Sequence, residues 1–160
     1  MKGDMSIFRL DAPLRRGITL IEASAGTGKT YGIASLFVRL VAEEGIAIDR
    51  ILVVTFTEAA TLELRTRLRA RLEEALALLH GERSGDDPGL ASLLVCDAPT
   101  LELRARRIEA AARSFDRAAV STIHGFCQRM LALHGFEAGV ELERELIADL
   151  APVLEELVTD

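Results

Sequence analysis

Residues 23–30 have the residue types and spacing that suit the binding of a nucleotide phosphate. The sequence Ala-Ser-Ala-Gly-Thr-Gly-Lys-Thr is a variant of the phosphate-binding loop, with alanine at the first glycine position. Gly26 and Gly28 allow backbone N–H groups to turn toward a phosphate, at the positive end of a helix dipole. We expect Lys29 to reach the β- and γ-phosphates and the Thr30 hydroxyl to bind Mg²⁺.

This pattern predicts a set of nucleotide-binding residues, and Lys29 and Thr30 are also the catalytic candidates. A dinucleotide-binding loop is disfavoured, because Tyr31 stands where a third glycine is required and no suitable acidic residue follows. A tight turn whose glycines serve packing alone is the other alternative, but a strand, a loop, a Lys-Thr pair and a helix together favour phosphate binding. The expected nucleotide-binding residues are Ala23, Ser24, Ala25, Gly26, Thr27, Gly28, Lys29 and Thr30.

The hydrophobic pattern around the loop predicts strands and helices in alternation. Apolar residues at 18–21 indicate a strand before the loop, and apolar residues at helical spacing indicate a helix from Lys29 to about Glu44, ended by Gly45. Residues 50–55 indicate a strand buried on both faces, followed by a long helix that Thr57 caps and that ends near His80. A strand, a helix and a strand in succession predict a parallel crossover.

The second half of the chain is expected to be mainly helical. Residues 81–89 indicate a loop, followed by a short helix to about Cys96 and a second helix, opened by Pro99 and Thr100, to about Ser114. Residues 118–122 indicate a third strand and residues 123–134 a helix that Gly135 ends. Leu142, Leu146, Leu150, Leu154 and Leu157 have helical spacing, interrupted near Pro152. We therefore divide the chain into residues 1–79, a helical insertion at 80–117, and residues 118–160.

Composition limits the class of protein and its compartment. The chain has 160 residues, 49% of them hydrophobic, which suits one globular domain. No apolar run is long enough for a membrane span or a signal peptide, so we expect no membrane partner and a cytoplasmic location. Cys96 and Cys127 lack zinc-site spacing and are expected in the core. The net charge of −6 comes from residues 137–160, with eight acids and one base, and therefore excludes no nucleic-acid partner.

Three segments together resemble the superfamily 1 DNA helicases of the UvrD, Rep and PcrA kind, and within them the beta-subunit family of exodeoxyribonuclease V. The segment at 21–30, IEASAGTGKT, is similar to the first helicase motif, and the segment at 53–67, VVTFTEAATLELRTR, to motif Ia. The segment at 120–130, VSTIHGFCQRM, is similar to the next DNA-contacting motif. The resemblance covers most of the chain and implies a P-loop NTPase fold of the RecA-like kind, with helices on both faces of a parallel sheet and a helical insertion.

The resemblance also implies ligands and partners. ATP and Mg²⁺ would bind at residues 23–30, and Thr55, Phe56, Thr57, Thr122 and His124 would contact single-stranded DNA. A Phe at a strand end offers a stacking surface for any base, whereas the alternatives are core packing for Phe56 and a local helix-start role for His124. The whole enzyme would be an ATP-dependent 3′ to 5′ helicase and exonuclease of double-strand break repair and recombination, with gamma and alpha subunits as partners.

The sequence departs from the family pattern at two places. No strand ending in Asp-Glu follows the loop, and 160 residues leave no room for a second RecA-like domain. Arg15 and Arg16 stand where relatives carry an adenine-contacting glutamine. We therefore expect an incomplete helicase domain that is inactive by itself. Other interpretations are a self-contained small P-loop NTPase or kinase, and a non-catalytic DNA-binding module. The alternating Arg65, Arg67, Arg69 and Arg71 are expected to form a solvated surface.

Overall fold

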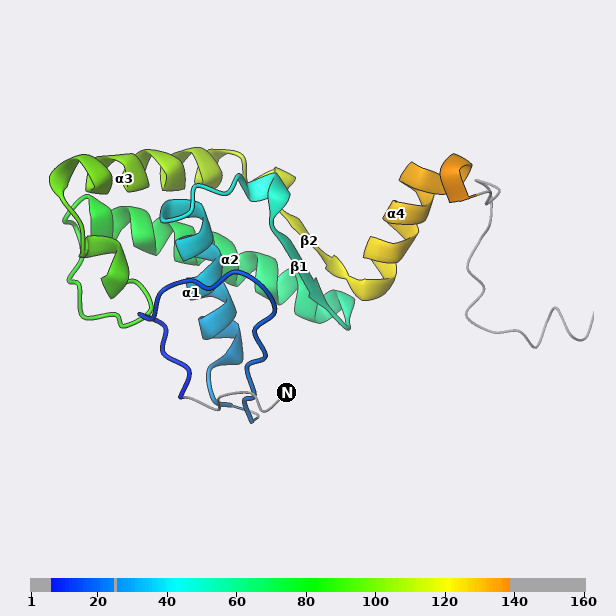
Figure 1. The fold of residues 1–160 in the computed structure, drawn as a ribbon, viewed down its shortest axis with the longest axis horizontal. Helices are drawn as coiled ribbons and strands as arrows, with labels where there is room; N and C mark the ends of the chain where they lie inside the picture. The colour runs from blue at the N-terminus through cyan, green and yellow to red at the C-terminus, as the bar shows by residue number, and fades with distance from the viewer. Residues whose placement is uncertain (1–6, 25, 139–160) are drawn as a thin grey trace, which may run out of the picture. The chain divides into compact units, whose positions relative to one another are not determined.

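The computed structural model describes residues 7–24 and 26–138, and of residues 135–138 the backbone only. Most of the residues in this part of the chain are helical, and two strands form a small parallel sheet (Figure 1). The helices are α1 (Lys29–Ala42), α2 (Glu58–Leu79), α3 (Ala98–Arg113) and α4 (Ile123–Ala138), and the strands are β1 (Leu52–Thr55) and β2 (Ala119–Thr122). Short 3₁₀ turns lie at η1 (Ile48–Arg50), η2 (Ala91–Leu94) and η3 (Phe115–Arg117).

The sheet of the described residues consists of β1 and β2, which run parallel. Leu52 pairs with Ala119 at one end, and Thr55 pairs with Thr122 at the other. The two strands are far apart in sequence, and α2, η2 and α3 lie between them. The sequence prediction of strands near 50–55 and 118–122 in a parallel sheet is therefore confirmed.

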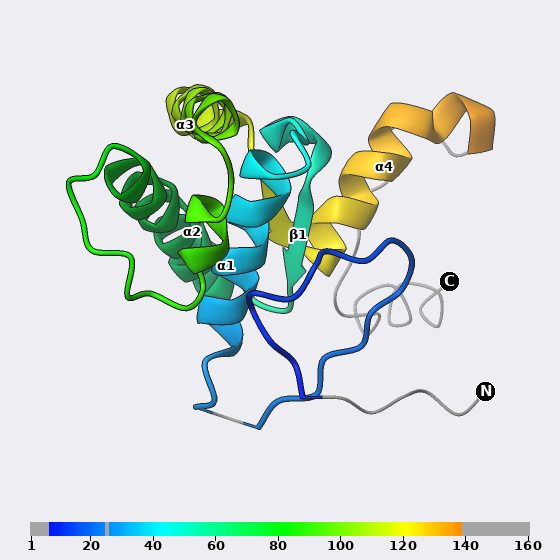
Figure 2. The same cartoon turned by 60° about the vertical axis from the view of Figure 1, so that its left-hand side comes forward.

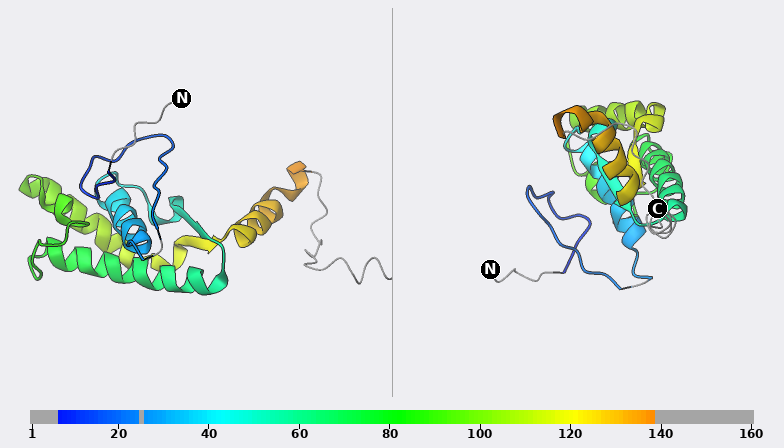
Figure 3. Two further views of the ribbon diagram at one scale, coloured as in Figure 1. Left: turned by 90° about the horizontal axis from the view of Figure 1, so that it is seen from below. Right: turned by 90° about the vertical axis from the view of Figure 1, so that its right-hand side faces the viewer.

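The hydrophobic core lies between α1, α2 and α3, which pack against one another. α3 packs along α2, and Figure 2 shows α3 nearly end-on and α2 obliquely, beside α1. The side chains of Phe37 from α1, Leu68 and Leu72 from α2, and Ile108 from α3 are almost fully buried. The region at 80–117 thus shares its core with the helices before it, and the further views of Figure 3 show the same packing.

Two helices begin at side chains that cap them. The Thr57 hydroxyl accepts a hydrogen bond from the Ala60 N–H at 3.1 Å, as the sequence predicts for α2. α3 begins earlier than expected, because Asp97 rather than Pro99 or Thr100 provides its cap and accepts from the Thr100 N–H at 3.1 Å. Such caps replace hydrogen bonds that the first turn of a helix otherwise lacks.

The end of α1 depends on a glycine and an arginine. Gly45 has a φ of +67°, in the left-handed region. α1 ends just before it, as the sequence predicts. The Arg107 guanidinium from α3 donates hydrogen bonds to the carbonyls of Ala42 at 2.8 Å and Glu43 at 3.2 Å. A side chain at position 45 would put its Cβ 2.8 Å from the Arg107 guanidinium, so both the backbone angle and the space require glycine.

Residues 18–21 are not a strand, contrary to the sequence prediction. Ile18 is fully exposed and Leu20 is 84% exposed. In the part of the chain that the structure describes, no strand is hydrogen-bonded to this segment, and a strand forms only when a neighbour pairs with its backbone groups. Leu52 and Val54 of β1 are each 44% exposed. The prediction that this strand is buried on both faces is therefore wrong.

Two further expectations are wrong, one on the end of α4 and one on the cysteines. α4 continues through Gly135 to Ala138, because one helical glycine costs only about 1 kcal/mol. Cys127 is exposed, and Cys96 is half-buried with its thiol 3.6 Å from the Leu93 carbonyl, so neither is a core residue. Residues from His124 onward form a unit of their own, described here by itself. The leucine pattern at 142–157 and Pro152 lie outside the described residues.

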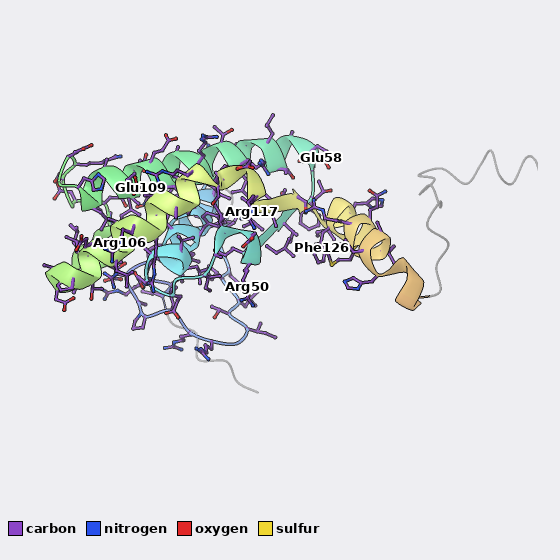
Figure 4. The ribbon with its side chains drawn as sticks, turned by 90° about the horizontal axis from the view of Figure 1, so that it is seen from above. Arg50, Glu58, Arg106, Glu109, Arg117 and Phe126 are labelled. Atoms are coloured by element: carbon purple, nitrogen blue, oxygen red, sulfur yellow. The ribbon has the colours of Figure 1, made fainter. Side chains whose placement is uncertain are left out.

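The outward surface of α3 is polar. Arg106 and Glu109 lie along it in Figure 4, and Arg106 pairs with Glu102 at 3.6 Å while Arg113 pairs with Glu109 at 2.6 Å. Such exposed ion pairs contribute little to stability. None of the helices in the described residues is long and apolar enough to cross a membrane.

We predict that Leu68→Ala lowers the free energy of unfolding by about 2 to 5 kcal/mol, because it leaves a cavity at a fully buried position of α2. Urea denaturation followed by circular dichroism measures this change. Leu62→Ala is the matched control, because Leu62 lies on the same helix and is 69% exposed. A loss as large for Leu62→Ala as for Leu68→Ala would show that the core is placed wrongly.

Candidate functional site

The loop before α1 has the backbone conformation that its glycines predict. Gly26 has a φ of +77°, and Gly28, the N-cap of α1, has a φ of +85°. A Cβ at either position would meet no atom within 4 Å, so glycine is needed here for its backbone angles rather than for space. Ala25, one of the expected nucleotide-binding residues, lies outside the described residues.

The Lys29 ammonium lies at the centre of this loop. It donates hydrogen bonds to the carbonyl oxygens of Ala23 and Ser24, both at 2.9 Å, and the Thr27 hydroxyl donates to the Ser24 carbonyl at 2.7 Å. The loop therefore folds around its own lysine. Anionic phosphate oxygens would make stronger, charge-assisted bonds to this ammonium than the two neutral carbonyls do.

The amino end of α1 carries an uncompensated positive partial charge. Gly28 makes no side-chain capping bond, and the first turn holds no acidic residue. The loop and Lys29 are exposed, and Thr30 is half-buried. An anion can therefore approach the N–H groups of this helix end from solvent.

The ends of the two strands bring together several of the residues expected to contact DNA. Thr55 and Thr122 are paired in register, and Phe56 follows β1 with 87% of its surface exposed. Phe56 is therefore not part of the described core. Thr57 uses its hydroxyl to cap α2. In Figure 1 the amino end of α1 and the carboxyl ends of both strands face the same way. His124 is exposed and belongs to the second unit.

The four alternating arginines do not form one solvated surface, contrary to the expectation. Arg67 and Arg69 are exposed and pair with Glu63 at 2.8 Å and with Glu73 at 3.6 Å. Arg65 donates to the Ala118 carbonyl at 3.2 Å, and Arg71 is buried. The sequence pattern of α2 indicates that Arg71 is buried, because position 71 falls on the same helix stripe as the buried leucines at 64, 68, 72 and 78.

Arg71 joins three separate segments through one guanidinium. Its two Nη atoms donate to the Asp87 carboxylate at 2.6 and 2.8 Å, and Nη1 also donates to Glu74 at 2.8 Å. Nη2 donates to the Ser35 hydroxyl on α1 at 2.9 Å, and the guanidinium lies 4.5 Å from the centre of the Tyr31 ring. We refer to Tyr31, Ser35, Arg71 and Asp87 as the Arg71 cluster.

Asp87 completes the cluster from the loop after α2. It accepts hydrogen bonds from the Tyr31 hydroxyl and from the Gly89 N–H, the latter at 2.8 Å. The Arg71 guanidinium holds the pKa of the Asp87 carboxyl well below its usual range, with help from the Tyr31 hydroxyl. Burial alone would lower the pKa of Arg71, but the hydrogen bonds to Asp87 and Glu74 raise it above its usual value. Both groups therefore stay charged at neutral pH.

A second arginine, Arg39 of α1, holds the N-terminal segment against the helix by hydrogen bonds. Arg39 is 2% exposed, pairs with Glu43 at 2.7 Å, and donates to the carbonyls of Leu10 at 2.5 Å and Ala12 at 2.7 Å. A hollow of about 340 Å³ lies beside it, lined by Phe8, Leu14, Ile21 and other residues of the N-terminal segment and α1. Its lining includes Arg15, one of the two arginines that stand where relatives carry an adenine-contacting glutamine.

The described part of the chain offers few metal ligands. No group of three or more His, Cys, Asp or Glu side chains there could hold a metal ion. If the Thr30 hydroxyl binds Mg²⁺ as the sequence predicts, a bound nucleotide's phosphates would have to supply further ligands.

Comparison with known proteins gives a consistent set of relatives. The UvrD/REP helicase N-terminal domain matches residues 10–158. The RecBCD enzyme subunit RecB of Escherichia coli K12 is 45% identical over 148 residues, which is 86% of this chain and 12% of that protein. The same subunit of Haemophilus influenzae is 40% identical over 149 residues, again 86% of this chain and 12% of that protein. In Mycobacterium tuberculosis H37Rv the identity is 37% over 159 residues, 98% of this chain and 14% of that protein.

We predict that Asp87→Asn lowers the free energy of unfolding at about pH 7 by about 2 to 4 kcal/mol, because it removes a charged partner of buried Arg71. The folded-state pKa of Asp87 lies below its ordinary value of 3.8. Its contribution is thus complete above that value and is lost as the pH falls toward the folded-state pKa. Urea titrations at several pH values should show the difference between wild type and variant shrinking in acid.

The control for this experiment is Asp86→Asn, which makes the same change on the neighbouring exposed residue outside the cluster. It should change stability little at any pH. A wild-type advantage over Asp87→Asn that stays constant from neutral pH into acid would contradict the assignment of the charge to Asp87.

Proposed function

This chain belongs to the UvrD/REP helicase N-terminal domain family, and from that premise we propose that residues 23–30 bind ATP in the ATP-binding part of a DNA helicase. The observation that carries the proposal is the Lys29 ammonium held by the carbonyls of Ala23 and Ser24, at the uncapped amino end of α1. The two left-handed glycines, Gly26 and Gly28, support it, because they let backbone N–H groups turn toward an anion.

The roles proposed for the loop residues follow from their chemistry. Lys29 exchanges its carbonyl partners for oxygens of the β- and γ-phosphates, and the N–H groups of the loop and of the first turn of α1 bind the remaining oxygens. The Thr30 hydroxyl contributes one ligand to Mg²⁺, which neutralises phosphate charge when it is bound. In this proposal the chain has the P-loop NTPase fold of the RecA-like kind, and residues 80–117 are an insertion between 1–79 and 118–160.

We also propose that the strand ends contact single-stranded DNA. Phe56, with its ring exposed to solvent, provides a stacking surface for a base. Thr55 and Thr122, paired in register, provide polar contacts at the strand ends, together with Thr57. His124, in the second unit, is proposed as a further contact to the DNA. Aromatic stacking of this kind tolerates any base, as an enzyme that moves along DNA requires.

The relatives favour a specific enzyme for these sites. The chain spans 12–14% of the length of the RecB subunits described above. We propose that the whole protein is the beta subunit of exodeoxyribonuclease V, a cytoplasmic ATP-dependent 3′ to 5′ helicase and nuclease of double-strand break repair and recombination, which assembles with gamma and alpha subunits. Residues 1–160 alone should not turn over ATP at a helicase rate, because Lys29 and Thr30 supply only part of the machinery for phosphoryl transfer.

We predict that Lys29→Ala abolishes the binding of ATP with Mg²⁺, because Lys29 supplies the positive charge at the centre of the loop. Isothermal titration calorimetry on the chain measures the affinity. Lys2→Ala is the control, because it removes the only other lysine of the sequence. Equal affinities for the wild type and Lys29→Ala would refute the proposed nucleotide site.

We predict that Phe56→Ala weakens the binding of a labelled single-stranded oligonucleotide by about 1 to 3 kcal/mol, the worth of one stacked base. Fluorescence anisotropy measures this affinity, and ATP affinity should change little. Phe56→Tyr keeps the aromatic face and should bind as the wild type does, whereas Phe56→Leu should behave like Phe56→Ala. If Phe56→Leu retains full affinity, the contact is not a stacking contact.

A further inference from the structure

The Arg71 cluster includes residues from the first two turns of α1, the helix that follows the proposed phosphate-binding loop. Tyr31 follows Thr30 in sequence and lies in the first turn of α1, and Ser35 lies one turn later. Among the described residues, Tyr31 is the first after the loop whose side chain is hydrogen-bonded to another element. The bonds made by Thr27 and Lys29 stay within the loop itself. The amino end of α1 is therefore fastened to the rest of the fold at Tyr31.

The cluster packs closely against the backbone at Gly89. A Cβ at Gly89 would lie 2.4 Å from the Ser35 hydroxyl, 2.6 Å from an Nη atom of Arg71 and 2.8 Å from the Tyr31 hydroxyl. A side chain at position 89 would therefore displace these three side-chain ends. The Gly89 N–H also donates to the Tyr31 hydroxyl at 3.1 Å. This close fit is independent of the charges, and it gives the Tyr31 hydroxyl a defined place beside Gly89.

The cluster is also costly to rearrange, because its central charge is buried. The Arg71 side chain is 6% exposed and the Asp87 side chain 20% exposed. A planar guanidinium that makes a two-point contact with a carboxylate has one favourable geometry, and a buried charge that loses a partner pays a large desolvation penalty. The position of the Tyr31 ring over this guanidinium is therefore fixed along with it.

We propose that Tyr31, Arg71 and Asp87 are positioning residues that set the place of Lys29 and Thr30 at the nucleotide phosphates. This inference rests on the proposed nucleotide site. In this proposal the three residues act through the first turn of α1 and are not themselves ligands of ATP or Mg²⁺. They fix the first turn of α1 against α2 and the loop at 87–89, and the first turn carries the lysine and the threonine. A small displacement of groups that must bind phosphate and metal together has a large effect on binding.

The decisive variant is Tyr31→Phe, which keeps the ring over Arg71 and removes the hydroxyl bonded to Asp87 and Gly89. We expect the affinity for inorganic triphosphate with Mg²⁺, and for ATP with Mg²⁺, to fall by the same factor of about ten, the worth of one hydrogen bond to a charged group. Calorimetry well below the melting temperature measures both ligands, and triphosphate reports on the phosphate site without any adenine contact. Asp87→Asn should lower the affinity by a smaller factor in the Tyr31→Phe background than in the wild type, because the two residues share one hydrogen bond.

Arg104→Met is the matched control for a purely structural role. Arg104 is a half-buried arginine that donates to the carbonyls of Ser92 and Leu93 and makes no contact with α1's first turn. It should lower the melting temperature without changing triphosphate affinity. If Tyr31→Phe also lowers only the melting temperature, the cluster is structural and the inference is overturned.

Two further measurements separate the possible failures. Ser35→Ala removes one bond to Arg71 without changing any loop residue, and it should lower triphosphate affinity in the same direction even if Tyr31→Phe does not fold. Unchanged affinity in Ser35→Ala would then count against the cluster. If Lys29→Ala binds triphosphate as the wild type does, the nucleotide site itself fails, which is a different result from a failure of Tyr31→Phe alone.

Discussion

The position of α1 depends on hydrogen bonds from arginine side chains near its start and around its last turn. Arg71 from α2 contacts its first two turns, Arg39 joins it to the N-terminal segment, and Arg107 from α3 binds the carbonyls at its last turn. The guanidinium suits all three tasks, because it presents several donors in a fixed plane and stays charged when it is buried. Arg107 also places a positive charge at the negative end of the helix dipole.

This arrangement leaves the amino end of α1 as the one end open to an anion. The sides of the helix are packed by Phe37, Val38 and Val41, and its carboxyl end is covered by Arg107 and Gly45. The loop before it folds locally around Lys29 and lies exposed. A rigid helix whose positive end is free can bind phosphate there. The arginine hydrogen bonds around α1 matter because they set the direction in which this end faces.

The two proposed sites are built in different ways. The phosphate site is a continuous stretch of eight residues, so its geometry is largely local. The strand-end site joins residues more than sixty positions apart in sequence, and the parallel pairing of β1 with β2 is what sets Thr55 beside Thr122. α2 connects the sites physically, because it begins at Thr57 beside the strand end and carries Arg71 in its second half.

Features that depend on near neighbours could be predicted from the sequence. The glycine angles of the loop, the Thr57 cap, the leucine stripe of α2 and the limits of α1 follow from spacings of a few residues, and the structure agrees with each of them. Features that depend on distant partners became visible only in the folded chain. Residues 18–21 have strand composition but no paired neighbour in the described chain, and Arg71 has the composition of a surface residue but meets Asp87 and Tyr31 in the interior. The spacing of α2 places position 71 on the buried stripe, but it does not identify Asp87 and Tyr31 as the partners of the arginine. Backbone pairing and the partners of a buried charge depend on which distant segments the fold brings together.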